Sequence, residues 1–191
     1  MKPIFEFVVK PSGSRYNNSV EVGDKSLILN TEIFNHQYVN REATIVSTPI
    51  YNPKGLKEGD TVILHHNVFR RWHNVKGIEK NSRSFLNEDE YLVSEDQMFM
   101  YKRDGQWVAM PGFTFVKPIK SQNNYDLTPE KPLVGIVKYS DGAFLPTQLV
   151  GFTPSSEYEF IVDGERLYRV MNNFITIKYE YQGDEEEYNP S

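Results

Sequence analysis

The sequence contains no cysteine among its 191 residues. This absence excludes a disulfide framework, a thiolate nucleophile and a zinc site with cysteine ligands. The 21 lysine and arginine residues are outnumbered by 26 aspartate and glutamate residues, so nothing in the net charge of -5 attracts nucleic acid. No apolar run approaches the roughly twenty residues that cross a bilayer, and residues 1–6 lack the apolar stretch of a signal peptide. We therefore expect a cytoplasmic protein that neither spans a membrane nor binds nucleic acid.

Motifs that indicate an enzyme are also missing. The sequence has no GxGxxG phosphate loop, and no nucleophile elbow accompanies its histidines. The one histidine cluster is His65, His66 and His73, and neighbouring histidines on a strand point to opposite faces of a sheet. A metal site with three converging ligands is therefore not expected there. The arginines and the tryptophan of residues 70–72 are interpreted as packing residues that face a neighbouring subunit. We expect no enzyme activity, no cofactor and no metal.

The sequence does contain short alternating segments of the β type, separated by turns. Residues 5–11 alternate and end at a proline, residues 41–47 form a second such segment, and residues 61–64 follow a Gly-Asp turn at Gly59 and Asp60. With 39% hydrophobic and 25% charged residues, the composition is that of a soluble globular protein. The pattern predicts an all-β fold.

The chain also repeats itself. Residues 113–118 resemble residues 5–11, and residues 167–179 resemble residues 91–103, in the same order. Two resemblances in one order indicate an internal duplication. The counterpart of residues 56–64 is then residues 149–152, which lack the aspartate.

A polar stretch, residues 12–24, is predicted to be a flexible loop because it offers no apolar face to bury. It leads to three consecutive aliphatic residues, Leu27, Ile28 and Leu29. Such a run is either an ordinary buried strand or an anchor that docks into a groove of a partner. The residue pattern alone leaves both interpretations open.

The order of these motifs resembles that of the GroES-type co-chaperonins. Residues 56–64 are similar to the Gly-Asp turn and strand of that family, and residues 91–103 to its closing pair of strands around an acidic turn. Residues 41–47 resemble another family strand, although Glu42 and Ala43 replace its usual Gly-Glu. The resemblance implies two GroES-like small β-barrels in tandem, the second truncated and degenerate. The implied organisation is a barrel at 1–104 with a mobile loop at 12–29 and an insert at 74–90, a connector at 105–112, a shorter barrel at 113–181 and an acidic tail at 182–191.

The resemblance further implies a function. GroES-type proteins form rings and cap a chaperonin through a mobile loop, so Leu27, Ile28 and Leu29 would bind the chaperonin and the chain would form a homo-oligomer. An alternative is a phage structural or virion-associated protein that reuses the barrel as an assembly module, located in the host cytoplasm or the virion. A related barrel occurs in medium-chain alcohol dehydrogenases, but their Gly-rich loop and cysteine zinc ligands are absent here.

Overall fold

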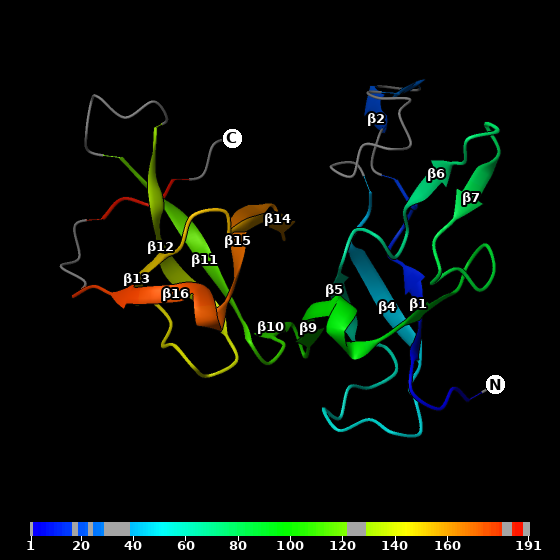
Figure 1. Ribbon diagram of the computed structural model, residues 1–191, viewed down its shortest axis with the longest axis horizontal. Helices are drawn as coiled ribbons and strands as arrows, with labels where there is room; N and C mark the ends of the chain where they lie inside the picture. The colour runs from blue at the N-terminus through cyan, green and yellow to red at the C-terminus, as the bar shows by residue number, and fades with distance from the viewer. Residues whose placement is uncertain are drawn as a thin grey trace. The chain divides into compact units, whose positions relative to one another are not determined.

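A computed structural model of the chain is all-β and divides into two compact units, Met1–Gln106 and Trp107–Ser191 (Figure 1). The structure describes residues 2–16, 19–22, 25–28, 39–121, 129–180 and 185–188, and for 19–22 and 25–28 it describes the backbone only. The described residues form two six-stranded sheets, and every strand pairing given below is antiparallel. The expected all-β class is confirmed.

The first sheet has the strand order β10-β9-β5-β4-β1-β8. Its strands are β1 (Phe7–Pro11), β4 (Glu42–Ser47), β5 (Thr61–Leu64), β8 (Tyr91–Val93), β9 (Met98–Arg103) and β10 (Gln106–Ala109). A short 3₁₀ turn, η2 (Glu95–Gln97), joins β8 to β9. Two small hairpins accompany this sheet, β2 (Ser19–Val22) with β3 (Lys25–Ile28) and β6 (Arg71–His73) with β7 (Glu79–Asn81).

The second sheet has the order β14-β15-β11-β12-β13-β16. Its strands are β11 (Phe113–Lys120), β12 (Glu130–Ser140), β13 (Leu149–Phe152), β14 (Tyr158–Val162), β15 (Glu165–Met171) and β16 (Ile175–Lys178). A 3₁₀ turn, η3 (Asn172–Phe174), joins β15 to β16. Asp163 and Gly164 connect β14 to β15 with φ values of 50° and 79°, as a type I′ turn requires.

One strand order is repeated in the two sheets. The series β9-β5-β4-β1-β8 of the first corresponds to β16-β13-β12-β11-β15 of the second, and in each a 3₁₀ turn joins the two outermost strands of the series. This order agrees with the internal repeat expected from the sequence. Each sheet keeps two edge strands, so pairing among the described strands does not close either sheet into a barrel.

Irregularities in strand pairing are repeated as well. The pairing of β1 with β4 shifts between Val8 and Val9, and that of β11 with β12 shifts between Phe115 and Val116. A second shift at the end of β5 recurs at the end of β13. Bulges re-aim the strand that carries them, so their recurrence shows that the two sheets bend at equivalent places.

Equivalent positions also form the two cores. When the registers of the two sheets are compared, buried residues of the first sheet correspond to buried residues of the second. The corresponding residues are Val9 and Val116, Ile45 and Val137, Val62 and Val150, Leu64 and Phe152, and Val93 and Val170. The five residues of the second sheet pack together as one cluster. Strands β5 and β13 also bury the residues between these positions, Ile63 and Gly151, as strands that are covered on both faces do.

Register also corrects the expected alignment of the repeat. Tyr91 pairs with Val9, and Tyr168 pairs with Val116, the residue equivalent to Val9. Tyr91 therefore corresponds to Tyr168, one residue later than the alignment that began at Leu167. The two segments have similar composition, so only strand pairing distinguishes these alignments.

Strands also occur in the predicted loop, the insert and the connector. Strand β2 lies inside the predicted loop 12–24, where Val20 and Val22 alternate with polar residues. The hairpin β6–β7 overlaps the insert 74–90, and strand β10 lies in the connector 105–112. The β9–β10 turn is Asp104-Gly105, with φ values of 51° and 80°.

The acidic tail is likewise not merely solvated in its described part, residues 185–188. The Lys120 N–H donates to the Glu186 carbonyl at 2.8 Å, and the Tyr188 N–H donates to the Pro118 carbonyl at 2.9 Å. Glu187 also forms an ion pair with Lys117 at 2.7 Å. This short segment therefore lies along β11, where backbone pairing and opposite charges both favour it.

Candidate functional site

The aliphatic residues expected to bind a partner lie at the end of the first small hairpin. Leu27 and Ile28 belong to β3 and pair with Val20 and Ser19 of β2, whereas Leu29 lies outside the described residues. The hairpin is part of the connection between β1 and β4. The equivalent connection in the second unit, between β11 and β12, is shorter in sequence.

Asn40 holds together the two ends of the β1–β4 connection. Its side-chain amide donates to the carbonyl oxygens of Ser12 and Ser14, both at 3.0 Å, and its Oδ1 accepts the Glu42 N–H at 2.9 Å. Asn40 is only 4% exposed, and its own N–H donates to the Arg15 carbonyl at 2.9 Å. A buried amide whose donors and acceptor are all used fixes the base from which the β2–β3 hairpin extends. Asn40 was not predicted from the sequence, because an asparagine before a strand is a common turn signal.

Arg15 and Tyr16 attach the same base to the rest of the first unit. The Arg15 guanidinium lies 5.2 Å from the ring centre of Tyr91 and 5.6 Å from that of Phe85, and it donates to the Phe69 carbonyl at 3.1 Å. The Tyr16 hydroxyl accepts the Arg71 N–H at 2.7 Å. Cation–π contacts and hydrogen bonds to buried groups restrict movement, so the connection leaves the core from a fixed position.

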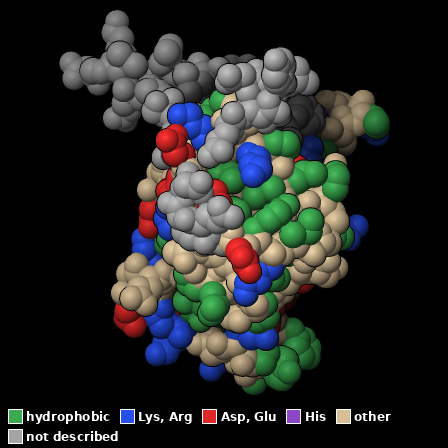
Figure 2. Space-filling view, turned by 90° about the vertical axis from the view of Figure 1, so that its left-hand side faces the viewer, with side chains coloured by type: hydrophobic (Ala, Val, Ile, Leu, Met, Phe, Trp, Pro, Cys, Tyr) green, Lys and Arg blue, Asp and Glu red, His purple; other side chains and the backbone are tan. Residues whose placement is uncertain are grey.

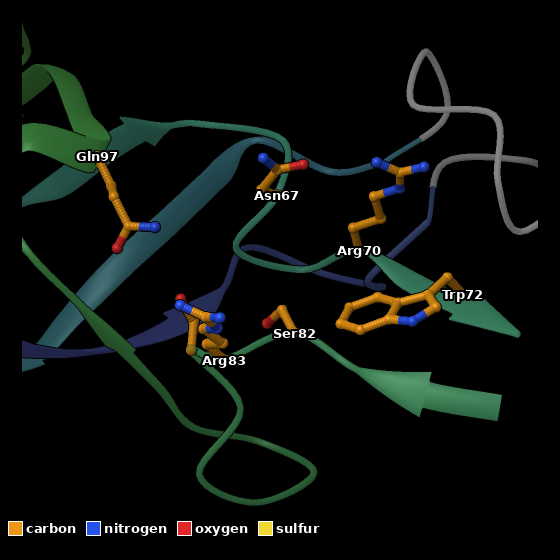
Figure 3. Close-up of a pocket in the computed structure, with 7 residues that line it drawn as sticks. Asn67, Arg70, Trp72, Ser82, Arg83 and Gln97 are labelled. Carbon is orange, nitrogen blue, oxygen red and sulfur yellow. The ribbon is translucent and has the colours of Figure 1, made fainter. Parts of the chain in front are cut away.

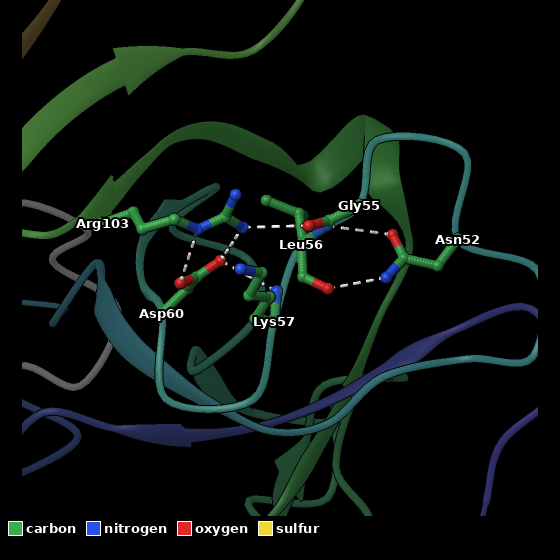
Figure 4. Close-up of polar contacts among 6 residues, drawn as sticks. All are labelled: Asn52, Gly55, Leu56, Lys57, Asp60 and Arg103. Atoms are coloured by element: carbon green, nitrogen blue, oxygen red, sulfur yellow. Dashed lines mark hydrogen bonds and ion pairs between the residues drawn. The ribbon is translucent and has the colours of Figure 1, made fainter.

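The Gly-Asp turn before β5 is held by an acidic side chain (Figure 4). Asp60 is 6% exposed and accepts the Lys57 N–H at 2.8 Å, while Arg103 of β9 donates to both carboxylate oxygens and to the Gly55 carbonyl. Burial by itself would raise the pKa of Asp60, but the hydrogen bonds from Arg103 and Lys57 outweigh it and lower the pKa below its usual value. Asn52 closes the same turn through hydrogen bonds with both backbone groups of Leu56. Every polar group in this cluster serves the fold.

The second unit reproduces this turn with different side chains. The Gly59 N–H donates to the Ile45 carbonyl at 2.8 Å, and the Thr147 N–H donates to the carbonyl of the equivalent Val137 at 2.8 Å. Both residues have left-handed backbone angles, with φ of 91° at Gly59 and 69° at Thr147. Gln148 therefore occupies the position of Asp60. The backbone turn is retained in the second unit, and the charged clamp is not.

The histidines differ from their expected arrangement. Strand β5 ends at Leu64, and the rings of His65 and His66 stack with centroids 4.3 Å apart instead of pointing to opposite faces. His65 Nδ1 accepts the Asn67 N–H at 3.1 Å, which fixes the start of the turn. In the part of the chain that the structure describes, no group of three or more histidine, aspartate or glutamate residues gathers as metal ligands would.

Several large apolar side chains are exposed near the N-terminus. Ile4 and Phe5 are 60% and 74% exposed, and they lie beside Ile50 and Tyr51, which are 68% and 66% exposed. Backbone hydrogen bonds join the two segments, from the Ile50 N–H to the Pro3 carbonyl and from the Tyr51 N–H to the Ile4 carbonyl. An ordered group of exposed apolar side chains is typical of a contact surface.

The second unit has exposed apolar side chains of its own. On the face that Figure 2 shows, hydrophobic side chains gather between charged ones. Ile177 and Tyr179 are exposed at and just beyond the edge strand β16. Apolar side chains at an unpaired sheet edge favour association with another chain.

Within the described residues, no helix has the length and apolar character needed to cross a membrane. Comparison with known protein families finds no family model that matches the chain, and comparison with characterised protein sequences finds no significant match.

Proposed function

We propose that this protein is a co-chaperonin-like assembly protein, built from two GroES-like units and binding a chaperonin through the β2–β3 hairpin. The observation that carries the proposal is the repeated strand order. Of the two equivalent connections, the one between β1 and β4 is longer than the one between β11 and β12, and it contains Leu27 and Ile28. No catalytic group is needed for such a role. The proposal rests on strand order and on the motif resemblance together.

The fixed base of the hairpin supports this role. Asn40, Arg15 and Tyr16 hold both ends of the connection, so the hairpin is presented at one place. Its register puts Leu27 and Ile28 opposite Val20 and Ser19, at the open end of the hairpin. A short aliphatic segment binds weakly by itself. An oligomer compensates because several hairpins bind at once, each raising the effective concentration of the next.

The exposed apolar groups supply surfaces for such an oligomer. Ile4, Phe5 and Tyr51 lie on the first unit, and Ile177 lies on an edge strand of the second. Contacts between copies of the chain would remove these side chains from water, at a gain of about 25 cal/mol for each Å² of apolar area. Measurement of the native mass tests this part of the proposal, and a monomer would contradict it.

Replacement of Ile28 by aspartate tests chaperonin binding. The variant Ile28→Asp places a charge in the proposed binding segment, and we expect it to abolish co-purification with a purified chaperonin because the charge would have to be desolvated. The matched control is Ile161→Asp, in which an isoleucine of β14 that is 61% exposed receives the same charge. Circular dichroism and thermal unfolding establish that both variants are folded. Undiminished binding by folded Ile28→Asp would overturn the proposal.

A second candidate function is a structural protein of a phage particle. The same exposed apolar side chains favour it, since a shell or connector component is defined by its contacts with neighbouring subunits. Recovery of the chain in purified particles, with no binding to a chaperonin, would favour this function over the first.

A further inference from the structure

The first unit contains a cavity that the function proposed above does not use. It has a volume of about 570 Å³ and is lined by Asn67, Arg70, Trp72, Ser82, Arg83, Ser84 and Gln97 (Figure 3). The lining comes from the turn after β5, strand β6, the segments that flank the hairpin β6–β7, and the 3₁₀ turn η2, which contributes Gln97. Cavities of this size commonly hold small molecules.

Two guanidinium groups give the cavity a positive charge. Arg70 and Arg83 form no ion pair with any residue that the structure describes, and none of the described residues that line the cavity is acidic. The neighbouring Arg71, in contrast, is paired with Glu79 at 3.1 Å. The Nε atom of Arg70 is enclosed and finds no hydrogen-bond partner among the described residues. Uncompensated guanidinium groups in a chain of net charge -5 indicate a place for an anion, and their planar fork matches phosphate or carboxylate.

Trp72 adds an aromatic surface beside these charges. It belongs to β6, is 37% exposed and borders the cavity close to Arg70 (Figure 3). An indole in this position provides a flat apolar face for a ring to stack on.

Polar side chains complete the lining. Ser82 donates its hydroxyl proton to the Val68 carbonyl at 2.5 Å, so its oxygen is held in place with lone pairs to accept a hydrogen bond. Gln97 accepts the Ser94 N–H at 3.2 Å through Oε1, which leaves its amide NH₂ to donate. Asn67 brings a further amide. The cavity thus offers donors and acceptors as well as charge and an aromatic face.

We propose that this cavity binds a small organic phosphate that carries a flat ring, of the size of a mononucleotide. Arg83 binds the phosphate, Trp72 stacks on the ring, and the serine and amide side chains hydrogen-bond to the polar groups between them. Arg70, whose guanidinium points away from Arg83 (Figure 3), adds positive charge to the site. A polyanion such as nucleic acid is disfavoured by the net negative charge of the chain. The proposal does not depend on chaperonin binding.

Calorimetric titration of the full chain tests the site, with AMP as the probe. Adenosine lacks the phosphate, ribose 5-phosphate lacks the base, and inorganic phosphate lacks both. We expect AMP to bind about tenfold or more tightly than each of the three, because charge-assisted hydrogen bonds and stacking both contribute. If adenosine binds as tightly as AMP, the guanidinium groups do not bind the phosphate. If inorganic phosphate binds as tightly as AMP, the cavity binds an adventitious ion only.

Substitutions locate the binding. Arg83 is exposed, so Arg83→Ala leaves the core intact and is expected to weaken AMP binding about tenfold or more. Trp72→Ala should weaken binding of AMP but not of ribose 5-phosphate. The matched control is Lys76→Ala, which removes one positive charge from the exposed β6–β7 turn outside the cavity. Equal AMP affinity in Arg83→Ala and the control, or no binding by the wild type up to about 1 mM, would refute the proposal.

Discussion

Replacement of Asp60 by glutamine measures what the charged clamp adds to the first unit. The substitution introduces the residue that the second unit has at the equivalent position, Gln148. It removes the charge that Arg103 and the Lys57 amide bind, while the turn itself keeps its glycine, Gly59. Hydrogen bonds to a charged group contribute about 1.5–3 kcal/mol. The Arg103 side chain is 27% exposed and partly screened by water, so we expect a loss of about 2 kcal/mol in the free energy of unfolding.

The pH dependence provides an independent check on the same residue. The pKa of Asp60 in the folded chain lies below the reference value of 3.8. The carboxylate therefore stabilises the fold fully above that value, and its contribution is lost as the pH falls through the folded pKa. The difference between wild type and Asp60→Gln should be constant near neutral pH and should shrink below pH 3.8.

Urea unfolding followed by tryptophan fluorescence, at neutral pH and at several acidic values, gives these free energies. The matched control is Glu58→Gln, which removes the same charge from an exposed position in the same turn. It should change stability by less than about 0.5 kcal/mol. If Asp60→Gln were as stable as this control at neutral pH, or if its deficit persisted unchanged in acid, the clamp would not act through its charge.

Two further substitutions test packing in the repeated sheets. Gly135→Ala should destabilise the chain by about 1–3 kcal/mol in urea unfolding, because the new Cβ would lie 2.8 Å from the Lys117 carbonyl oxygen. The equivalent position of the first sheet is occupied by Ala43. Unchanged stability would show that β11 and β12 can separate locally. Tyr91→Phe should leave stability unchanged or raise it by about 1 kcal/mol, because the buried Tyr91 hydroxyl has no hydrogen-bond partner in the part of the chain that the structure describes. A clear loss of stability in thermal unfolding would mean that the hydroxyl does have a partner.

Local residue types predicted most of the strand framework. Gly59 and Asp60 identify their turn because each supplies a local property, a left-handed backbone angle and a short acceptor. The turn at Thr147 was harder to recognise, since threonine rarely adopts φ of 69°, and the counterpart of Asp60 was therefore not identified as Gln148.

The cavity could not be predicted from the same local signals. Arg70 and Trp72 lie beside Ser82 because β6 pairs with β7, with Trp72 opposite Lys80. This pairing depends on a turn in which the Asn74 side chain accepts the N–H groups of both Lys76 and Ile78, and such a turn leaves no hydrophobic period. Residues 70–72 were interpreted as packing residues for this reason.

The repeated strand order has a consequence for the parity and valency of any assembly. Each chain contributes two sheets of one order but a single β2–β3 hairpin. A closed ring of whole chains therefore contains an even number of sheets, and an odd-membered ring of sheets cannot form. The valency of such a ring towards a partner equals the number of chains, which is half the number of its sheets.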